Sequence, residues 1–337
     1  MDEKSKVFKV LSLDGGGIKG LFGATILADV EKRKQAYISD MFDLVCGTST
    51  GGILALAIAM KIPMAEVCDF YREHGPDIFS EREKKHFLKR YLYRIKHLPS
   101  YRMLCKPKYE SNILRNALVS VFGNRKIGES NNLLCIPSFN ITQWTPCVFK
   151  YDHTPLLTRD NNKTCVEVAM ATTAAPTYFN TVNIGPDQHI DGGLWANNPT
   201  LCGILEAYEY FVGEGKAYQK LSVLSIGCLS SPKGENADAN SVRGFLNWGA
   251  KLFDAYSDGQ SFFTDLFIRK LSPHWNINYQ RIDHVKQSKD HIDCLDMDNA
   301  SYSSLKLLES CGQNVANNIK MDSEIEAFFE TNKTLKI

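Results

Sequence analysis

Two glycine-rich turns, each placed between a short apolar run and a segment of helical period, constrain this chain most. The first apolar run, Phe8–Leu13, leads into Asp14–Gly20, and the second, Met41–Cys46, leads into Gly47–Gly52. The segment after the second turn, Ile53–Met60, is apolar on every side, so other elements should cover it. Strand-length runs that alternate with helical segments predict a layered α/β domain.

Composition excludes several other classes of protein. The chain has 337 residues, of which 44% are hydrophobic, and 39 basic residues stand against 38 acidic ones. This balance is typical of an ordinary globular protein and disfavours disorder, collagen-like repetition and a nucleic acid polymer as partner. The longest apolar run, Ile53–Met60, is far shorter than the roughly 20 residues of a membrane-spanning helix. The first ten residues do not resemble a secretory signal, so we expect a cytoplasmic location.

The rest of the chain extends the same pattern. We expect one domain, with a core over residues 8–212 and a C-terminal part, residues 213–337, packed on it, because no Pro/Gly/Ser-rich linker separates them. The expected strands are Leu133–Asn140, Cys147–Tyr151 and Leu221–Ile226, and the expected helices are Val166–Ala174 and Thr200–Phe211.

One segment, residues 81–108, departs from this pattern and is expected to be an insertion over the edge of the sheet. It carries ten basic residues and two acidic ones, with tyrosines and a phenylalanine between them. One interpretation is an interfacial patch that anionic lipid headgroups attract. The other is a solvated helix surface whose lysine and arginine stems cover the core. Both interpretations stay open.

Ser49 is the first candidate for catalysis. It lies in Gly47-Thr48-Ser49-Thr50-Gly51, between a predicted strand and a predicted helix. This context is typical of a nucleophile elbow, in which flanking glycines allow a sharp turn that exposes the serine hydroxyl. The N-terminus of the following helix would favour a developing negative charge nearby.

The glycine loop Asp14–Gly20 is the second candidate. Its successive glycines can aim backbone N–H groups at a negative charge, as an oxyanion hole or as a phosphate cradle. Gly15, Gly17 and Gly20 also match the dinucleotide-binding fingerprint, so a nucleotide-binding module is the alternative function. That fingerprint requires an acidic residue at the end of the second strand, where this chain has Leu44-Val45-Cys46 instead.

Asp191, in Asp191-Gly192-Gly193, is the best candidate for the general base. A serine hydrolase needs a proton acceptor, and glycines beside this carboxylate allow close approach. A histidine base remains the alternative. His189 shares a strand face with Asp191 and is the first to test, and a Ser-Asp-His order would use His274, His284 or His291.

Neither the cysteines nor any other residues indicate a bound metal or cofactor. Ten cysteines are too few for a disulfide scaffold, and none forms a Cys-x-x-Cys or a Cys/His ligand cluster. Most lie among apolar residues, where a reduced thiol behaves as a small buried hydrophobic group. We expect no metal, because the proposed chemistry needs none.

Taken together and in this order, Asp14–Gly20, Gly47–Gly51 and Asp191–Gly193 resemble the patatin-like phospholipase family. The likeness extends to Ala174–Phe179, and more loosely to Asn278–Ile282 and Leu295–Ser304. It implies a three-layer α/β/α fold with a central, mainly parallel sheet. It also implies an acyl hydrolase that cleaves fatty-acyl esters of membrane phospholipids through a serine and an aspartate, without a histidine.

The resemblance assigns a role to each matching residue. It makes Ser49 the nucleophile and Asp191 the base. The remaining positions are the oxyanion-hole residues Gly15, Gly16 and Gly17 and the motif-supporting residues Gly20, Gly47, Gly51, Gly192 and Gly193. Lys19 stands where the family often has arginine, which keeps the charge but not the planar fork.

The resemblance leans toward bacterial members, some of which are effectors of antiviral defence. These are silent until a cyclic dinucleotide binds, and then degrade the membrane of their own cell. The likeness therefore implies a phospholipid membrane surface as substrate and a cyclic dinucleotide as activator, with the active protein peripheral at the inner membrane. No nucleotide site follows from the residues themselves, and a homo-oligomer stays open.

Overall fold

The computed structural model describes residues 6–80, 106–229, 251–283 and 294–331, together with 333 and 335. Within these residues an eight-stranded sheet runs in the order β5-β6-β3-β2-β1-β7-β8, with β4 paired to β3. Its strands are β1 Val7–Leu13, β2 Leu44–Gly47, β3 Leu133–Asn140, β4 Thr145–Lys150, β5 Val182–Ile184, β6 Asp187–Asp191, β7 Lys220–Ile226 and β8 Ile277–Ile282.

The centre of the sheet is parallel and one end is antiparallel. β3, β2, β1, β7 and β8 pair in parallel, whereas β4, β5 and β6 form antiparallel pairs beside β3. Because the parallel strands all end at the same edge, the loops that follow β1 and β2 meet there. This edge brings the two glycine-rich turns together.

Alternating side chains of the strands give the sheet two apolar faces. On β1, Phe8 and Val10 belong to one buried cluster, whereas Leu11 and Leu13 belong to another on the opposite face. This is the period-two alternation of a strand that is buried on both sides. The sheet therefore needs a layer of helices on each face.

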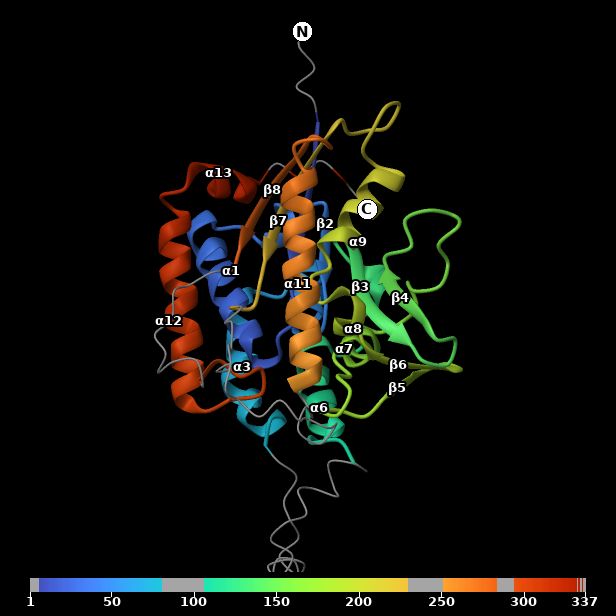
Figure 1. The fold of residues 1–337 in the computed structure, drawn as a ribbon, viewed down its shortest axis with the longest axis vertical. Helices are drawn as coiled ribbons and strands as arrows, with labels where there is room; N and C mark the ends of the chain where they lie inside the picture. Colours follow the sequence, from blue (N-terminus) through green and yellow to red (C-terminus); the bar gives the residue numbers. More distant parts are fainter. Residues whose placement is uncertain are drawn as a thin grey trace, which may run out of the picture.

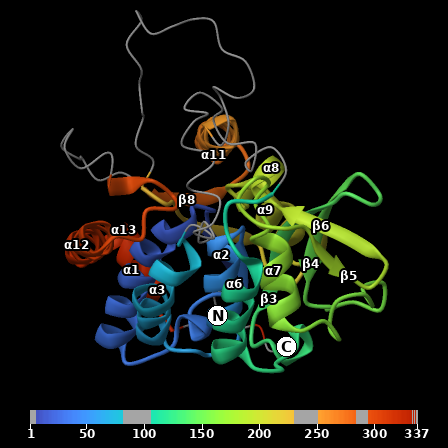
Figure 2. The same cartoon turned by 90° about the horizontal axis from the view of Figure 1, so that it is seen from below.

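Helices supply both layers (Figures 1 and 2). The larger cluster draws its helical residues from α1 Gly20–Lys34, α2 Thr50–Ala59, α3 Met64–Ile78, α6 Ser111–Phe122, α7 Cys165–Thr172 and α12 Tyr302–Ile319. The smaller cluster draws on α9 Thr200–Tyr210 and α11 Lys251–Leu271. Two short helices, α8 Gly193–Ala196 and α13 Ser323–Glu326, complete the set in the described residues. The predicted three-layer α/β/α fold with a mainly parallel sheet is confirmed.

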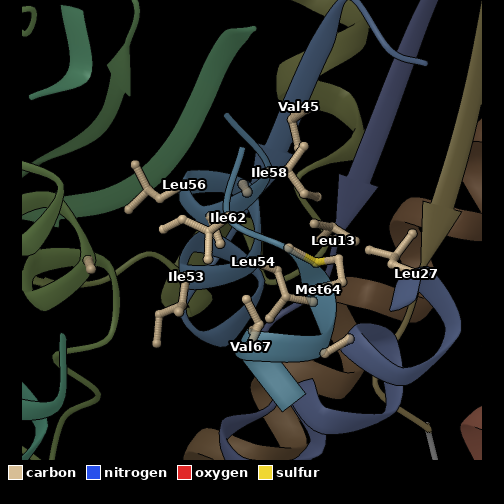
Figure 3. Close-up of a cluster of buried hydrophobic side chains, with 14 of the residues drawn as sticks. Leu13, Leu27, Val45, Ile53, Leu54, Leu56, Ile58, Ile62, Met64 and Val67 are labelled. Carbon is tan, nitrogen blue, oxygen red and sulfur yellow. The ribbon is translucent and has the colours of Figure 1, made fainter. Parts of the chain in front are cut away.

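Helix α2 forms the centre of the larger core, and every one of its residues is buried. Figure 3 shows its side chains Ile53, Leu54 and Ile58 among those of neighbouring elements. The sequence correctly predicts a covered apolar helix here, but starts it at Ile53. The helix begins at Thr50, because the turn that contains Ser49 sets its first residue.

The C-terminal part contributes strands to the same sheet as the N-terminal part. β7 lies between β1 and β8 and pairs with both in parallel. The predicted boundary between residues 212 and 213 stays a prediction.

Most of the predicted basic insertion, residues 81–105, lies outside the described residues. Of the remainder, Lys108 Nζ lies 2.6 Å from the Asp298 carboxylate.

Within the described residues, no helix has the length and apolar composition needed to cross a bilayer.

Candidate active site

Ser49 occupies a sharp turn between the end of β2 and the start of α2. Its backbone has φ 55° and ψ −123°, a positive φ that a residue with a side chain rarely adopts. Its N–H donates to Thr172 Oγ1 at 3.0 Å, and Thr172 Oγ1 donates in turn to the carbonyl oxygen of Pro137 at 2.6 Å. The turn is therefore held from β3 and α7 as well as by its own chain.

The turn requires glycine at two positions, because a side chain at either one would clash with the backbone. A Cβ added at Gly47 would lie 2.0 Å from the carbonyl oxygen of Gly51, and one at Gly51 would lie 2.2 Å from that of Leu13. Both clashes are with backbone atoms, which cannot swing aside as a side chain can. The sequence pattern of a nucleophile elbow thus has its structural counterpart at Ser49.

Asp191 ends β6, and its carboxyl group is buried beside Ser49. Asp191 is 1% exposed, and its Oδ1 accepts a hydrogen bond of 2.7 Å from the N–H of Gly193. The strand is placed by pairing with β3, where Asp191 lies opposite Ser138. A Cβ at Gly192 would lie 2.4 Å from the carbonyl oxygen of Pro137, so glycine is required for this close approach.

The surroundings of Asp191 change its proton affinity. Burial raises the pKa of its carboxyl from 3.8 to about 7, although the Gly193 N–H and the Ser49 side chain, acting as hydrogen-bond donors, both lower it. The Ser49 side chain is therefore near enough to the carboxyl to influence its pKa. A carboxyl with a pKa near neutrality is a better proton acceptor than an ordinary aspartate.

The glycine loop after β1 lies against the Ser49 turn. A Cβ at Gly15 would lie 3.3 Å from Cβ of Ser49, which shows how near the two backbones are. The N–H of Gly15, however, donates to the carbonyl oxygen of Asn197 at 3.0 Å. Within the described residues, the N–H groups of Gly16 and Gly17 have no such acceptor. Of the three expected oxyanion donors, the Gly15 N–H therefore already has another acceptor.

Gly17 is fixed by a close contact with the chain before α12. It has φ +58°, and a Cβ there would lie 2.1 Å from the carbonyl oxygen of Met297. The same oxygen accepts a hydrogen bond of 2.8 Å from the N–H of Ile18. This contact holds the loop in one conformation, which an oxyanion hole requires.

Ser49 lines a cavity that is partly open to solvent. Helices α2, α3 and α6 contribute aliphatic and aromatic walls, including Ile53, Phe70 and Leu114, and Gly17 lies at the same cavity. Tyr178 and Phe179, from the predicted Ala174–Phe179 stretch, add further rings. An apolar cavity that adjoins a serine suits a long hydrocarbon chain.

The histidine alternative receives no support from the geometry. His189 is buried on β6, its ring packs on Phe149, and its Nδ1 lies 3.4 Å from Ser138 Oγ. Burial lowers the pKa of its imidazole, which favours the neutral form. His274 lies just after α11 and is exposed, whereas His284 and His291 lie outside the described residues.

Below the glycine loop, a buried ionic network fixes Asp14, the first residue of that loop. Arg281 Nη2 on β8 lies 2.7 Å from a carboxylate oxygen of Asp14 and 2.7 Å from one of Asp283. Its Nη1 donates to Ser225 Oγ at 2.7 Å. Burial raises the pKa of Asp14 to about 6, although the charge of Arg281 opposes that rise.

The network reaches the site from the other face of the sheet as well. The side chain of Ser261 on α11 is near enough to Asp14 to lower the pKa of its carboxyl, and Asn197 Nδ2 donates to Ser261 Oγ at 2.9 Å. Sequence reasoning missed Asn197, Ser261 and Arg281 as site residues. The only signal was that Arg281 lies in the Asn278–Ile282 stretch, and no local pattern marks the other two.

Replacing Arg281 with methionine should strongly destabilise the protein. The arginine side chain is 4% exposed, so its removal takes the Arg281 charge from the buried carboxylate of Asp14 and from that of Asp283, which is 14% exposed. We expect a cost of about 3–5 kcal/mol. Chemical denaturation measures the free energy of unfolding. Arg72→Met is the matched control, because Arg72 pairs with Asp69 and Glu309 at the surface, where a pair contributes about 1 kcal/mol or less. Equal losses in both variants would contradict the prediction.

No group of three or more His, Cys, Asp or Glu side chains in the described ranges could hold a metal ion.

Comparison with known proteins agrees with this geometry. The sequence model described as patatin-like phospholipase matches residues 11–201. A "cGAMP-activated phospholipase" of Pseudomonas aeruginosa is 30% identical over 95% of this chain and 91% of its own length. Another protein of that name, from Vibrio cholerae, is 32% identical over 91% of this chain and 90% of its own. "Patatin-like protein 2" of rice is 31% identical over 80% of this chain and 74% of its own length.

The family match covers more than half of the chain and includes all three motifs that carried the resemblance. The expected enzyme class, a phospholipase-type hydrolase, is confirmed with it. The chain belongs to the patatin-like phospholipase family.

Proposed function

We propose that this protein hydrolyses fatty-acyl esters of membrane phospholipids, with Ser49 as nucleophile and Asp191 as general base. One observation carries the proposal: Ser49, a buried Asp191 and the glycine loop meet at the same edge of the sheet, beside an apolar cavity. A nucleophile, a base within reach and oriented N–H donors are the groups that acyl transfer requires.

The first chemical step forms the acyl-enzyme. Ser49 Oγ attacks the ester carbonyl carbon while its proton passes to the Asp191 carboxylate. The carbonyl oxygen becomes an oxyanion, which the N–H groups of Gly16 and Gly17 stabilise. Collapse of this intermediate expels the lysolipid alcohol, which takes the proton from Asp191.

The second step releases the fatty acid. Water attacks the acyl group on Ser49, and Asp191 accepts a proton from that water and returns it to Ser49 Oγ. Meanwhile the hydrocarbon chain lies in the cavity between α2, α3 and α6. No histidine takes part in this mechanism, because Asp191 serves as the proton acceptor for Ser49.

A cyclic dinucleotide is the proposed activator, and antiviral defence the proposed setting. Two relatives that align with nine-tenths or more of both chains carry the name cGAMP-activated phospholipase. We propose that the protein stays in the cytoplasm and becomes peripheral at the inner membrane when activated. A homo-oligomeric state stays a prediction.

Lipid analysis tests the activity. Phospholipid vesicles are incubated with the wild-type protein or Ser49→Ala, each with and without cyclic GMP–AMP, and released fatty acids and lysolipids are measured by mass spectrometry. We expect release by the wild type, greatest with the nucleotide, and none by Ser49→Ala. Equal release by both proteins, or none by the wild type in either arm, would contradict the proposal. Nucleotide binding without any ester hydrolysis would instead favour the nucleotide-binding alternative.

A further inference from the structure

Between Leu252 and Leu266, helix α11 has its polarity inverted, although Ile268 further along is buried in the smaller apolar cluster. The side that faces the protein presents small polar side chains, among them Ser257, Ser261 and Thr264, all of them buried. The opposite side presents large apolar ones. These exposed residues are Leu252, Tyr256, Phe262, Phe263 and Leu266, here called the α11 outer face. A surface helix ordinarily buries its apolar stripe and exposes its polar one.

The polar inner face has a structural reason, because it packs against the candidate site. Ser257 Oγ donates to the carbonyl oxygen of Gly193 at 3.4 Å, and the Gln260 side chain accepts from the N–H of Asn198 at 2.9 Å. Ser261 joins the network around Asp14. Among the residues that the structure describes, no comparable contact explains the large apolar side chains of the outer face.

The α11 outer face is open to its surroundings. Phe262 is 72% exposed and Phe263 is 64% exposed, although both are among the side chains that gain most from burial. Figure 2 shows α11 at the outer edge of the described part of the chain, beyond α8 and α9. A contiguous apolar strip of this kind, rather than a single exposed side chain, indicates an interaction surface.

The charged side chains of α11 lie beside the α11 outer face or beyond its end. No charged residue lies on it from Leu252 to Leu266. The helical spacing places the acidic residues Asp254, Asp258 and Asp265 together on one flank. At the C-terminal end, Arg269 and Lys270 follow the strip and are exposed, and Arg269 pairs with Asp265 at 2.9 Å. An apolar strip that leads to basic residues, with carboxylates held to one side, is complementary to acyl chains and anionic headgroups.

The strip also continues toward the cavity that Ser49 lines. Phe253, on the same helix, lies 3.3 Å from the position that a Cβ of Gly193 would occupy. It packs on a small buried cluster that contains Ala175 and Tyr178, and these two residues also line the cavity. A surface that contacts α11 is therefore next to the cavity wall.

From these observations we infer that the α11 outer face docks on the surface of a phospholipid bilayer. The inference rests on the proposed function, because the substrate of a phospholipase lies in such a surface. Docking inserts Phe262 and Phe263 among the acyl chains, at the depth that aromatic side chains of interfacial helices reach. Trp275, beyond the C-terminal end of α11, is partly exposed and packs near Phe267, as suits a residue at the headgroup level.

Vesicle co-sedimentation tests the inference separately from catalysis. The Ser49→Ala protein is used so that no lipid is consumed, with vesicles of phosphatidylcholine and phosphatidylglycerol, with and without cyclic GMP–AMP. We expect binding in at least one arm. The added changes Phe262→Ser and Phe263→Ser should reduce the partition coefficient about tenfold or more. The matched control adds Leu156→Ser and Met321→Ser, which replace apolar side chains that are 87% and 90% exposed elsewhere, and should bind as Ser49→Ala does.

Two further measurements distinguish the possible failures. With Ser49 intact, Phe262→Ser/Phe263→Ser should hydrolyse a short, water-soluble ester as fast as the wild type but vesicles much more slowly. If the soluble ester is cleaved by a Ser49-dependent reaction while vesicle binding is absent or unaffected by the two changes, the docking inference fails and the proposed function stands. If sedimentation velocity shows a dimer that the two changes dissociate, a second copy covers this face and the inference is overturned.

Discussion

Ser49→Ala will lose ester hydrolysis almost completely, with kcat lower by at least about 10⁴-fold. In the proposed mechanism the serine oxygen forms the covalent bond to the acyl group, and neither neighbouring threonine hydroxyl is placed to replace it. Thr48 Oγ1 is turned away and donates to the carbonyl oxygen of Ala196 at 2.5 Å, and Thr50 Oγ1 is hydrogen-bonded to the buried Tyr71 hydroxyl. Hydrolysis of a short chromogenic ester, followed at saturating substrate, measures this loss.

Stability shows whether the loss is chemical or structural. The positive φ of Ser49 costs about 1–3 kcal/mol, and only glycine adopts such a conformation freely. Ser49→Ala keeps the Cβ and therefore the strain, so its free energy of unfolding should stay near that of the wild type. Ser49→Gly relieves the strain but adds about 0.5–1 kcal/mol of backbone entropy to the cost of folding. It should be inactive yet somewhat more stable than Ser49→Ala.

If Ser49→Ala were unstable, its loss of activity could result from unfolding rather than from the missing hydroxyl. The Ser49→Gly variant is therefore the decisive control. If Ser49→Gly retains hydrolysis, the nucleophile is another residue. If it is inactive and more stable than the alanine variant, the strained turn serves catalysis at the expense of stability, as is common at active sites.

The parts of the candidate site that depend on a local sequence pattern could be predicted from the sequence. The turns of Ser49, Asp191 and Gly17 each need glycines at fixed spacing, because backbone atoms of the same turn or of other segments come within 2.0–2.4 Å of where a Cβ would be. Those glycines are visible in the sequence. Strands β3 and β7 were likewise predicted nearly to the residue, since their apolar runs are buried on both faces.

What the sequence could not predict depends on contacts between distant segments. The Gly15 N–H was expected to serve the oxyanion, but the carbonyl oxygen of Asn197 occupies it. Arg281 has no distinctive neighbours along the chain, and its importance arises because β8 brings it to Asp14. His189 is two residues from Asp191 in the sequence, which made it the first histidine to test. Its ring packs on Phe149, which belongs to another strand.

Activity should rise as the pH passes through about 7, because Asp191 accepts a proton only when it is ionised. Its folded-state pKa is raised from 3.8 to about 7, chiefly by burial. The pH profile of kcat/KM on a soluble ester should therefore follow a single ionisation, with a tenfold fall per pH unit below that pKa. A profile that is flat between pH 5 and pH 8 would exclude Asp191 as the base.

The same shift in pKa makes stability depend on pH in the opposite direction. Below pH 3.8 the carboxyl of Asp191 is protonated in both states and contributes nothing. Between pH 3.8 and about 7 it ionises in the unfolded chain but stays protonated in the folded one, so the free energy of unfolding falls as the pH rises. Above pH 7 the full penalty, about 4 kcal/mol, is present.

Asp191→Asn should therefore be inactive and, at pH 8, more stable than the wild type by up to about 4 kcal/mol. The amide has no charge to bury, and its oxygen can still accept the hydrogen bond from the Gly193 N–H. At pH 4 the two proteins should unfold with nearly equal free energies, because the wild-type carboxyl is then protonated when folded. Asp14 titrates in both proteins, so its contribution cancels in the difference. Denaturation at both pH values measures that difference. A variant less stable than the wild type at pH 8 would contradict the prediction. It would show that groups other than Gly193 and Ser49 stabilise the buried charge of the Asp191 carboxylate.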